Sequence, residues 1–91
     1  MVHFKNNISS NVKTEIDVRG LTIDEAIPEI DAYLDRAFFA HLHQVRILHG
    51  KGTGKLREGI QKYLKKSKYV KSFENAPYGE GDFGVTIVNL K

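Results

Sequence analysis

The stretch Leu48–Leu56, LHGKGTGKL, places a histidine and two lysines around three glycines at alternate positions. Glycine lets a backbone approach a ligand closely and adopt positive φ angles. Free N–H groups in such a loop, together with the lysine charges, would bind a phosphate. A neighbouring imidazole can exchange a proton near neutral pH. The candidate phosphate-site residues are therefore His49, Gly50, Lys51, Gly52, Gly54 and Lys55.

The glycine spacing differs from the patterns that cradle bound nucleotides. In the pattern G-x-x-x-x-G-K-[ST], His49 would occupy the first glycine position, and Leu56 would replace the hydroxyl that binds magnesium. The pattern G-x-G-x-x-G fails as well, because these glycines are evenly spaced by two. The sequence therefore argues against a bound nucleotide. A plain strand–helix connection with a structural histidine remains the alternative to a phosphate site.

Two further polar residues end an apolar-alternating run near the N-terminus. Asp17 and Arg19 close the run 12–18, and His49 follows the apolar run 45–48. If these two runs are parallel strands, all three residues lie at the carboxyl edge of the sheet, where α/β proteins tend to bind ligands. A carboxylate, a guanidinium and an imidazole beside a phosphate loop could support phosphodiester cleavage. The alternative is that Asp17 and Arg19 pair with each other or with helix ends.

The histidines do not suggest a metal site. His41 and His43 form an H-x-H pair, and the chain contains no cysteine. The strand predicted before His49 separates it from this pair by about 15 Å, at ~3.3 Å per residue. We therefore predict that no metal ion is held by these side chains.

Periodicity predicts six elements in the order β-α-β-α-β-β. Thr22 with Glu25 forms a capping box that predicts a helix ending near Ala40. Pro28 removes a backbone donor, so we expect a kink or a slightly later helix start. The second helix carries an inner stripe of Leu56, Ile60, Tyr63 and Leu64. The predicted strands are 12–18, 45–48, 69–74 and 85–90, and the predicted helices are 22–40 and 55–66.

This element order predicts an α/β protein of the α+β two-layer sandwich type. A four-stranded mixed sheet would carry two helices on one face, with a parallel pair of strands joined by a right-handed crossover and an antiparallel final pair. Residues 1–11 are polar and are predicted to be a flexible arm or linker stub, so the domain covers residues 12–91. No signal peptide or apolar run long enough to cross a membrane is present. With the lack of cysteine, this fits a cytoplasmic protein.

Charge is segregated along the chain, although the formal net charge is only +3. Between residues 14 and 40 there are seven carboxylates against two arginines, whereas residues 41–73 carry nine cations against Glu58 alone. One side of the domain should therefore attract a polyanion, unless both runs are ordinary solvated helix faces. The cations predicted to carry nucleic-acid binding are Lys51, Lys55, Arg57 and Lys62, with Lys65 and Lys66 extending the track.

The segment 77–84, PYGEGDFG, is a long glycine-rich connection between two predicted strands. Such a connection is uncommon without a role. We expect it to fold over a bound strand, with Tyr78 or Phe83 stacking on a base. The alternative is a disordered tip.

Three segments together resemble a known family. IDVRG (16–20), HGKGTG (49–54) and GVTIVNL (84–90) are similar to the three successive motifs of the Smr, or small MutS-related, domain, and in particular to the C-terminal Smr domains of bacterial MutS2 proteins. The resemblance implies a fold similar to the C-terminal domain of translation initiation factor three, and an endonuclease that nicks DNA or cleaves RNA. It makes Asp17 the acid of the first motif, and His49, Gly50 and Gly52 the loop of the second.

The resemblance also implies a longer, dimeric parent protein. An ATPase and DNA-clamp region would precede Met1, so ATP would be a cofactor only of that region, and Lys91 would lie at or near the natural end. Partners would be branched or double-stranded DNA, in suppression of recombination, or ribosomal RNA or mRNA, in rescue of collided ribosomes. Divalent metal assistance stays open.

The sequence departs from the family pattern at one position. Many Smr domains have Asp-x-His in the first motif, whereas this chain has Arg19, which cannot exchange a proton. We expect catalysis by Asp17, Arg19 and His49, with Asp17 orienting His49 or activating water. The alternative is a nucleic-acid-binding module without cleavage.

Overall fold

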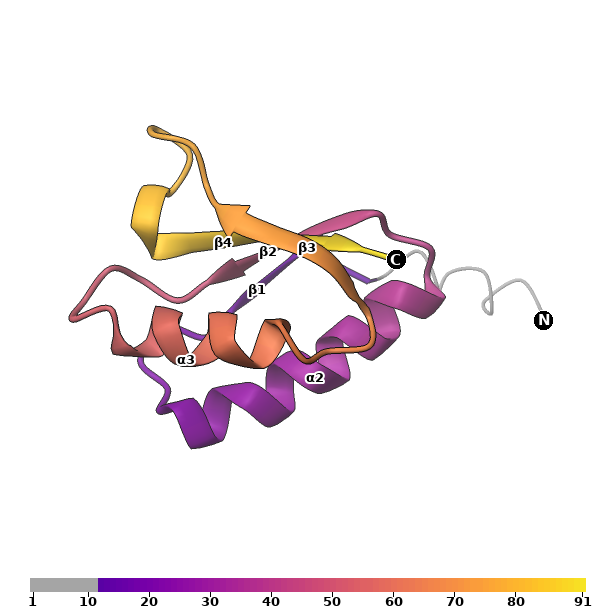
Figure 1. The fold of residues 1–91 in the computed structure, drawn as a ribbon, viewed down its shortest axis with the longest axis horizontal. Helices are drawn as coiled ribbons and strands as arrows, with labels where there is room; N and C mark the ends of the chain where they lie inside the picture. Colours follow the sequence, from indigo (N-terminus) through magenta and orange to yellow (C-terminus); the bar gives the residue numbers. More distant parts are fainter. Residues whose placement is uncertain (1–11) are drawn as a thin grey trace, which may run out of the picture.

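The computed structural model describes residues 12–91, and the predicted N-terminal arm lies outside them. Two helices cover one face of a four-stranded sheet (Figure 1). A 3₁₀ turn, η1, precedes the last strand. In chain order the elements are β1 (Glu15–Asp17), α2 (Ile23–Phe39), β2 (Gln44–Leu48), α3 (Lys55–Leu64), β3 (Val70–Asn75), η1 (Asp82–Gly84) and β4 (Val85–Leu90).

Helix α2 begins where the capping box predicts. The Thr22 hydroxyl accepts the Glu25 N–H at 3.2 Å, and the Glu25 carboxylate accepts the Thr22 N–H at 2.9 Å. The predicted later start is therefore wrong, and the helix runs through Pro28 to Phe39. Pro28 is tolerated because it lies on the exposed face, where water can bind the Asp24 carbonyl that lacks its helical partner.

The core lies between the helices and the sheet. Helix α2 buries Ile30 and Leu34, and α3 buries Ile60 and Leu64 against strand residues of β2 and β4. The predicted inner stripe of α3 is confirmed, because all four of its residues lie in the core or pack against it. On α2 the burial of Tyr33 was not predicted. Its ring is buried and its hydroxyl donates to the Lys13 carbonyl.

The sheet order is β1-β2-β4-β3, with β1 parallel to β2 and both other pairs antiparallel. Strand β4 thus inserts between β2 and β3, so the predicted mixed sheet and antiparallel final pair are confirmed. Strand β1 is shorter than the predicted 12–18, because it is an edge strand that pairs with β2 alone. In this pairing Asp17 lies opposite Leu48.

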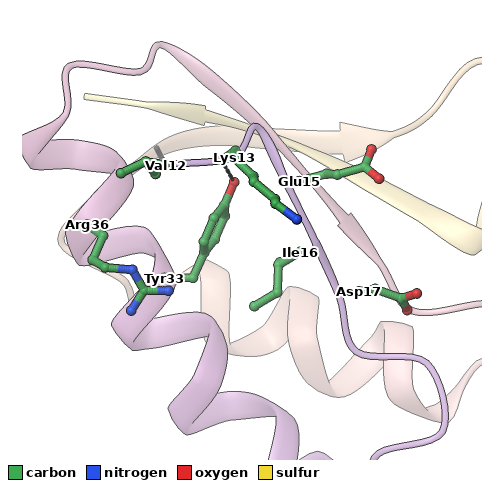
Figure 2. A pocket seen from close by; sticks show the side chains of 7 residues that line it. All are labelled: Val12, Lys13, Glu15, Ile16, Asp17, Tyr33 and Arg36. Carbon is green, nitrogen blue, oxygen red and sulfur yellow. Dashed lines mark hydrogen bonds between the residues drawn. The ribbon is translucent and has the colours of Figure 1, made fainter. Parts of the chain in front are cut away.

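An open groove of about 580 Å³ lies between the free edge of β1 and α2, and Figure 2 shows the side chains that line it. Tyr33 rises through it toward the Lys13 carbonyl, and the Glu15 and Asp17 carboxylates point away from its ring. The groove contains none of the candidate phosphate-site residues, although Asp17 lies at its edge. Among residues 12–91, neither helix combines the length and apolar character that a bilayer crossing requires.

The capping box at Thr22 yields a stability prediction. Thr22→Ala removes the acceptor for the Glu25 N–H and should lower the free energy of unfolding by about 1 kcal/mol. Urea denaturation followed by circular dichroism measures this. Thr22→Ser is the matched control and should stay within a few tenths of a kcal/mol of the parent, because it retains the hydroxyl. Equal losses in both variants would contradict a role for the cap.

Candidate functional site

Three connections meet at one edge of the sheet. Because β1 and β2 are parallel and Asp17 lies opposite Leu48, the residues after both strands share the carboxyl edge. Strand β4 is antiparallel and starts opposite the same position, with Val85 paired to Leu48. The predicted convergence of Asp17, Arg19 and His49 at this edge is confirmed, and the segment 77–84 joins them there.

The glycine loop uses left-handed backbone at all three glycines. The φ angles are +81° at Gly50, +39° at Gly52 and +88° at Gly54, values that residues with a side chain rarely adopt. Gly54 is the N-cap of α3 and supplies no side chain. The Lys55 N–H donates to the Thr53 hydroxyl at 3.4 Å, and the next N–H groups of the first turn of α3 point out of the helix end, where an anion can accept them.

Gly50 is enclosed on two sides. The Gly84 carbonyl accepts the N–H groups of both His49, at 3.1 Å, and Gly50, at 2.9 Å. On the other side, the Arg19 side chain passes 3.5 Å from where a β-carbon on Gly50 would lie. The glycine loop is thus hydrogen-bonded to Gly84, just before β4, and the Arg19 side chain lies over it. Gly52, by contrast, has open space where its β-carbon would be.

Asp17 and Arg19 form the bidentate pair that was the alternative reading of this motif. The Asp17 oxygens accept the Arg19 Nε–H at 2.9 Å and a terminal N–H at 2.6 Å, and one of them also accepts the Arg19 backbone N–H at 3.0 Å. The Arg19 guanidinium holds the pKa of Asp17 down at about 2. Asp17 is therefore an anion at any physiological pH, and its fixed partner is the guanidinium.

His49 is almost entirely buried, with 5% of its surface exposed. Its Nδ1 lies 2.9 Å from the Gly50 carbonyl oxygen, and its Nε2 lies 2.8 Å from the Thr86 Oγ1. Burial, opposed by the Gly50 bond, lowers the pKa of His49, so the ring is neutral at pH 7. The prediction that Asp17 orients His49 is wrong, because both ring nitrogens bond elsewhere.

The predicted cations are distributed around this edge. Lys51 pairs with Asp82 at 3.6 Å, and the Arg57 guanidinium lies 5.4 Å from the centre of the Phe83 ring. Lys55 and Lys62 are exposed on α3. Lys51 on the loop and Lys55 and Lys62 on α3 are thus exposed cations, whereas Arg57 is half-buried beside Phe83.

The segment 77–84 is a structured turn rather than a disordered tip. The Arg46 guanidinium donates to the Glu80 carbonyl at 2.6 Å, and backbone bonds from Glu80 to Pro77 and from Gly84 to Gly81 close the turn. Tyr78 is 91% exposed and Phe83 is 54% exposed. Both rings are thus accessible, and base stacking by either stays a prediction.

The sequence reasoning missed two polar residues behind the loop. Thr86 is fully buried on β4, and Gln61 on α3 donates to its hydroxyl at 3.1 Å. A signal for Thr86 was present, since it is a hydroxyl residue inside the apolar run 85–88. No group of three His, Asp or Glu side chains in residues 12–91 is placed to share a metal ion.

Comparison with known proteins identifies the family. The Smr domain model matches residues 16–91. The chain belongs to the Smr domain family. The crystal structure of the Smr domain of Thermus thermophilus MutS2 superimposes with a TM-score of 0.84 at 49% identity, and the match covers 87% of this chain and 99% of that one. The predicted resemblance to MutS2-type Smr domains and the predicted fold are thereby confirmed.

Two longer relatives named Endonuclease MutS2 match as well. The protein of Caldanaerobacter subterraneus subsp. tengcongensis is 53% identical over 87 residues, covering 96% of this chain and 11% of the relative. The protein of Acetivibrio thermocellus is 55% identical over 83 residues, covering 91% of this chain and 10% of the relative. The chain thus spans about a tenth of the length of these relatives.

The Asp17–Arg19 pair predicts a specific titration. In the folded Smr domain Asp17 has a pKa of about 2, against 3.8 without its partner. Because the folded pKa is depressed, any stabilisation from the pair is present above pH 3.8 and is lost as the pH falls toward 2. Arg19→Ala should raise the pKa of Asp17 toward 3.8, measured by NMR titration of the carboxyl carbon.

Arg36→Ala is the control for this titration. Arg36 lines the same groove as Asp17 but makes no hydrogen bond or ion pair with its carboxylate, so the pKa of Asp17 should stay near 2. A parent Asp17 that titrates near 3.8 would contradict the bidentate pair in solution.

Proposed function

We propose that this Smr domain binds a backbone phosphate of DNA at the glycine loop and nicks the phosphodiester bond there. One observation carries the proposal: the Arg19 side chain lies over Gly50, so a guanidinium, left-handed glycines and the start of α3 share one sheet edge. All three are donors for a phosphate. The name of the relatives, Endonuclease MutS2, supports cleavage as the outcome.

In this proposal catalysis is mainly electrostatic. Asp17 occupies two side-chain N–H groups of Arg19, which leaves three of its five donors for phosphate oxygens. As a water oxygen bonds to phosphorus and the bond to the sugar oxygen breaks, negative charge grows on the phosphoryl oxygens; the water releases its proton to solvent, and the departing sugar oxygen takes one from solvent. Preorganised donors at those oxygens usually provide the largest part of such catalysis. Asp17 positions Arg19, and its remaining lone pairs can orient the water.

The residues at this edge do not build a metal site. Both Asp17 oxygens are engaged by Arg19, and within residues 12–91 no third ligand gathers around them. A protein-held divalent ion needs several free oxygen ligands. We therefore assign no step to a metal, and a chelator tests this assignment.

A second candidate function is nucleic-acid binding without cleavage. Two observations favour it: both ring nitrogens of His49 are hydrogen-bonded within the protein, and the Asp17 carboxylate is paired with Arg19, which makes it a weak base. In a longer parent, such a module would dock other regions onto branched DNA or ribosomal RNA. Its binding surface would be the same, so only a cleavage assay separates the two candidates.

The cleavage prediction centres on Arg19. The purified domain should convert supercoiled plasmid to the open circle, and Arg19→Ala should slow this by about 10²–10³-fold, the usual effect of losing one transition-state donor. Arg36→Ala, which removes an exposed arginine from α2, should nick like the parent. Agarose gels with and without chelator measure the rates, and a labelled single-stranded RNA tests the other substrate class.

Each outcome decides between the candidates. Nicking that requires Arg19 and survives the chelator supports the proposal. Binding without nicking by the parent favours the docking module, and cleavage of the RNA alone favours a ribosome-directed role. Equal nicking by the parent and by Arg19→Ala would place the activity elsewhere.

Binding should be electrostatic at the glycine loop. If Lys51 and Lys55 each neutralise one phosphate, the double variant Lys51→Gln, Lys55→Gln should reduce the slope of log affinity against log salt by about 1.8 for duplex DNA. Fluorescence anisotropy at several salt concentrations measures this. The double variant Lys68→Gln, Lys71→Gln removes the same charge after α3, away from the loop, and should change the slope less. Equal slopes in the two double variants would show that only net charge matters.

A further inference from the structure

A chain of hydrogen-bonded polar groups, buried at His49 and Thr86, runs behind the glycine loop. It starts at Gln61 on α3, whose amide nitrogen donates to the Thr86 hydroxyl at 3.1 Å and to the Asn75 side chain at 3.0 Å. It continues from Thr86 to His49 Nε2 at 2.8 Å, and from His49 Nδ1 to the Gly50 carbonyl at 2.9 Å. Three elements, α3, β3 and β4, are thereby connected through His49 to one peptide of the loop.

The direction of each bond follows from the chemistry of its ends. A carbonyl can only accept, so His49 Nδ1 must carry the proton that bonds to Gly50. In a neutral ring Nε2 is then an acceptor, and the Thr86 hydroxyl must donate to it. The hydroxyl oxygen in turn accepts the amide hydrogen of Gln61. All the donors point the same way, from Gln61 toward the loop.

The last bond orients the peptide between Gly50 and Lys51. In a trans peptide the N–H points opposite to the carbonyl. Because the Gly50 carbonyl points inward to His49, the Lys51 N–H points outward. Within residues 12–91 this N–H has no protein acceptor. It is therefore available to a phosphate on the surface where Lys51 and Arg19 lie.

We propose that Gln61 and Thr86 are positioning residues, which hold His49 as the neutral Nδ1–H tautomer so that it aims the Lys51 N–H at the bound phosphate. His49 is then a positioning residue as well, and it transfers no proton to the substrate. The burial of His49 and Thr86 supports this, because a hydrogen bond in a water-free site is costly to break. This inference rests on the proposed phosphate site, but its first test does not depend on cleavage.

The first test replaces the hydrogen-bond donor at Gln61, where the chain of bonds starts, by an acceptor. In Gln61→Glu the new carboxylate can only accept, so it draws the Thr86 hydroxyl hydrogen away from His49. His49 Nε2 should then acquire a proton, and the pKa of the ring should rise by about 1 or more. Lys62→Glu is the control, because it adds an acidic side chain at the next, exposed position of α3, outside the chain of bonds.

The measurement is ¹⁵N NMR of histidine-labelled protein. In the parent at pH 7, His49 should show a protonated Nδ1 and an unprotonated Nε2, and Lys62→Glu should leave this pattern unchanged. An Nε2–H tautomer in the parent would overturn the proposal. So would a His49 signal in Gln61→Glu that titrates like that of the parent.

The second test asks whether this chain of hydrogen bonds affects phosphate binding by the Lys51 N–H. Titration with oligothymidylate should shift the Lys51 amide signal in the parent, and Thr86→Val, which has no hydroxyl, should lose most of this shift and bind at least about 10-fold more weakly. Thr86→Ser restores the hydroxyl and should recover both. Equal Lys51 shifts in Thr86→Val and the parent, with both folded by circular dichroism, would refute the positioning role. If the parent binds the DNA and shows the Lys51 shift but never nicks plasmid, the proposed cleavage fails while this inference stands.

Discussion

The Gly84 carbonyl is the contact on which the site depends. By accepting the N–H groups of both His49 and Gly50, it extends the pairing of β2 and β4 past Leu48 and into the glycine loop. A loop with three left-handed glycines would otherwise carry a large conformational entropy. Fastening its first two residues to a central strand leaves the remaining N–H groups preorganised, which is what charge stabilisation in a transition state requires.

The position of Arg19 also follows from the pairing of the strands. The parallel register of β1 and β2 sets Asp17 opposite Leu48, and the bidentate bonds that Arg19 donates to Asp17 then fix its guanidinium, while its aliphatic part lies over Gly50. An arginine on an exposed turn is ordinarily free to move, and a surface ion pair alone contributes little stability. The value of this pair thus lies in placing a permanent cation, which a histidine at the same position could not provide at neutral pH.

Local signals in the sequence predicted most of the fold. The capping box at Thr22, the β-branched run 85–90 and the alternation ending at Val18 each depend on neighbours in the chain, and each marks an element that the structure contains, although β1 is shorter than predicted. The partners of His49 could not be predicted in this way. Its bonds to Thr86 and, through it, to Gln61 join residues far apart in sequence, and they exist only because β4 inserts beside β2 under α3. Likewise, the sequence D-x-R could not decide whether Asp17 is a catalytic residue or simply pairs with Arg19.

The acidic helix α2 and the basic helix α3 pack side by side without neutralising each other. Tyrosine hydroxyls bond to the α2 carboxylates that face the basic elements, Tyr63 to Asp31 and Tyr69 to Asp35, and the latter bond raises the pKa of Tyr69 to about 12. The salt bridges within residues 12–91 involve only Arg19, Arg46 and Lys51, so no α2 carboxylate pairs with an α3 lysine. Satisfying these carboxylates with neutral donors leaves the α3 cations available to a polyanion. Lysines in place of the two tyrosines would instead pair with these carboxylates, so their positive charge would be neutralised within the protein.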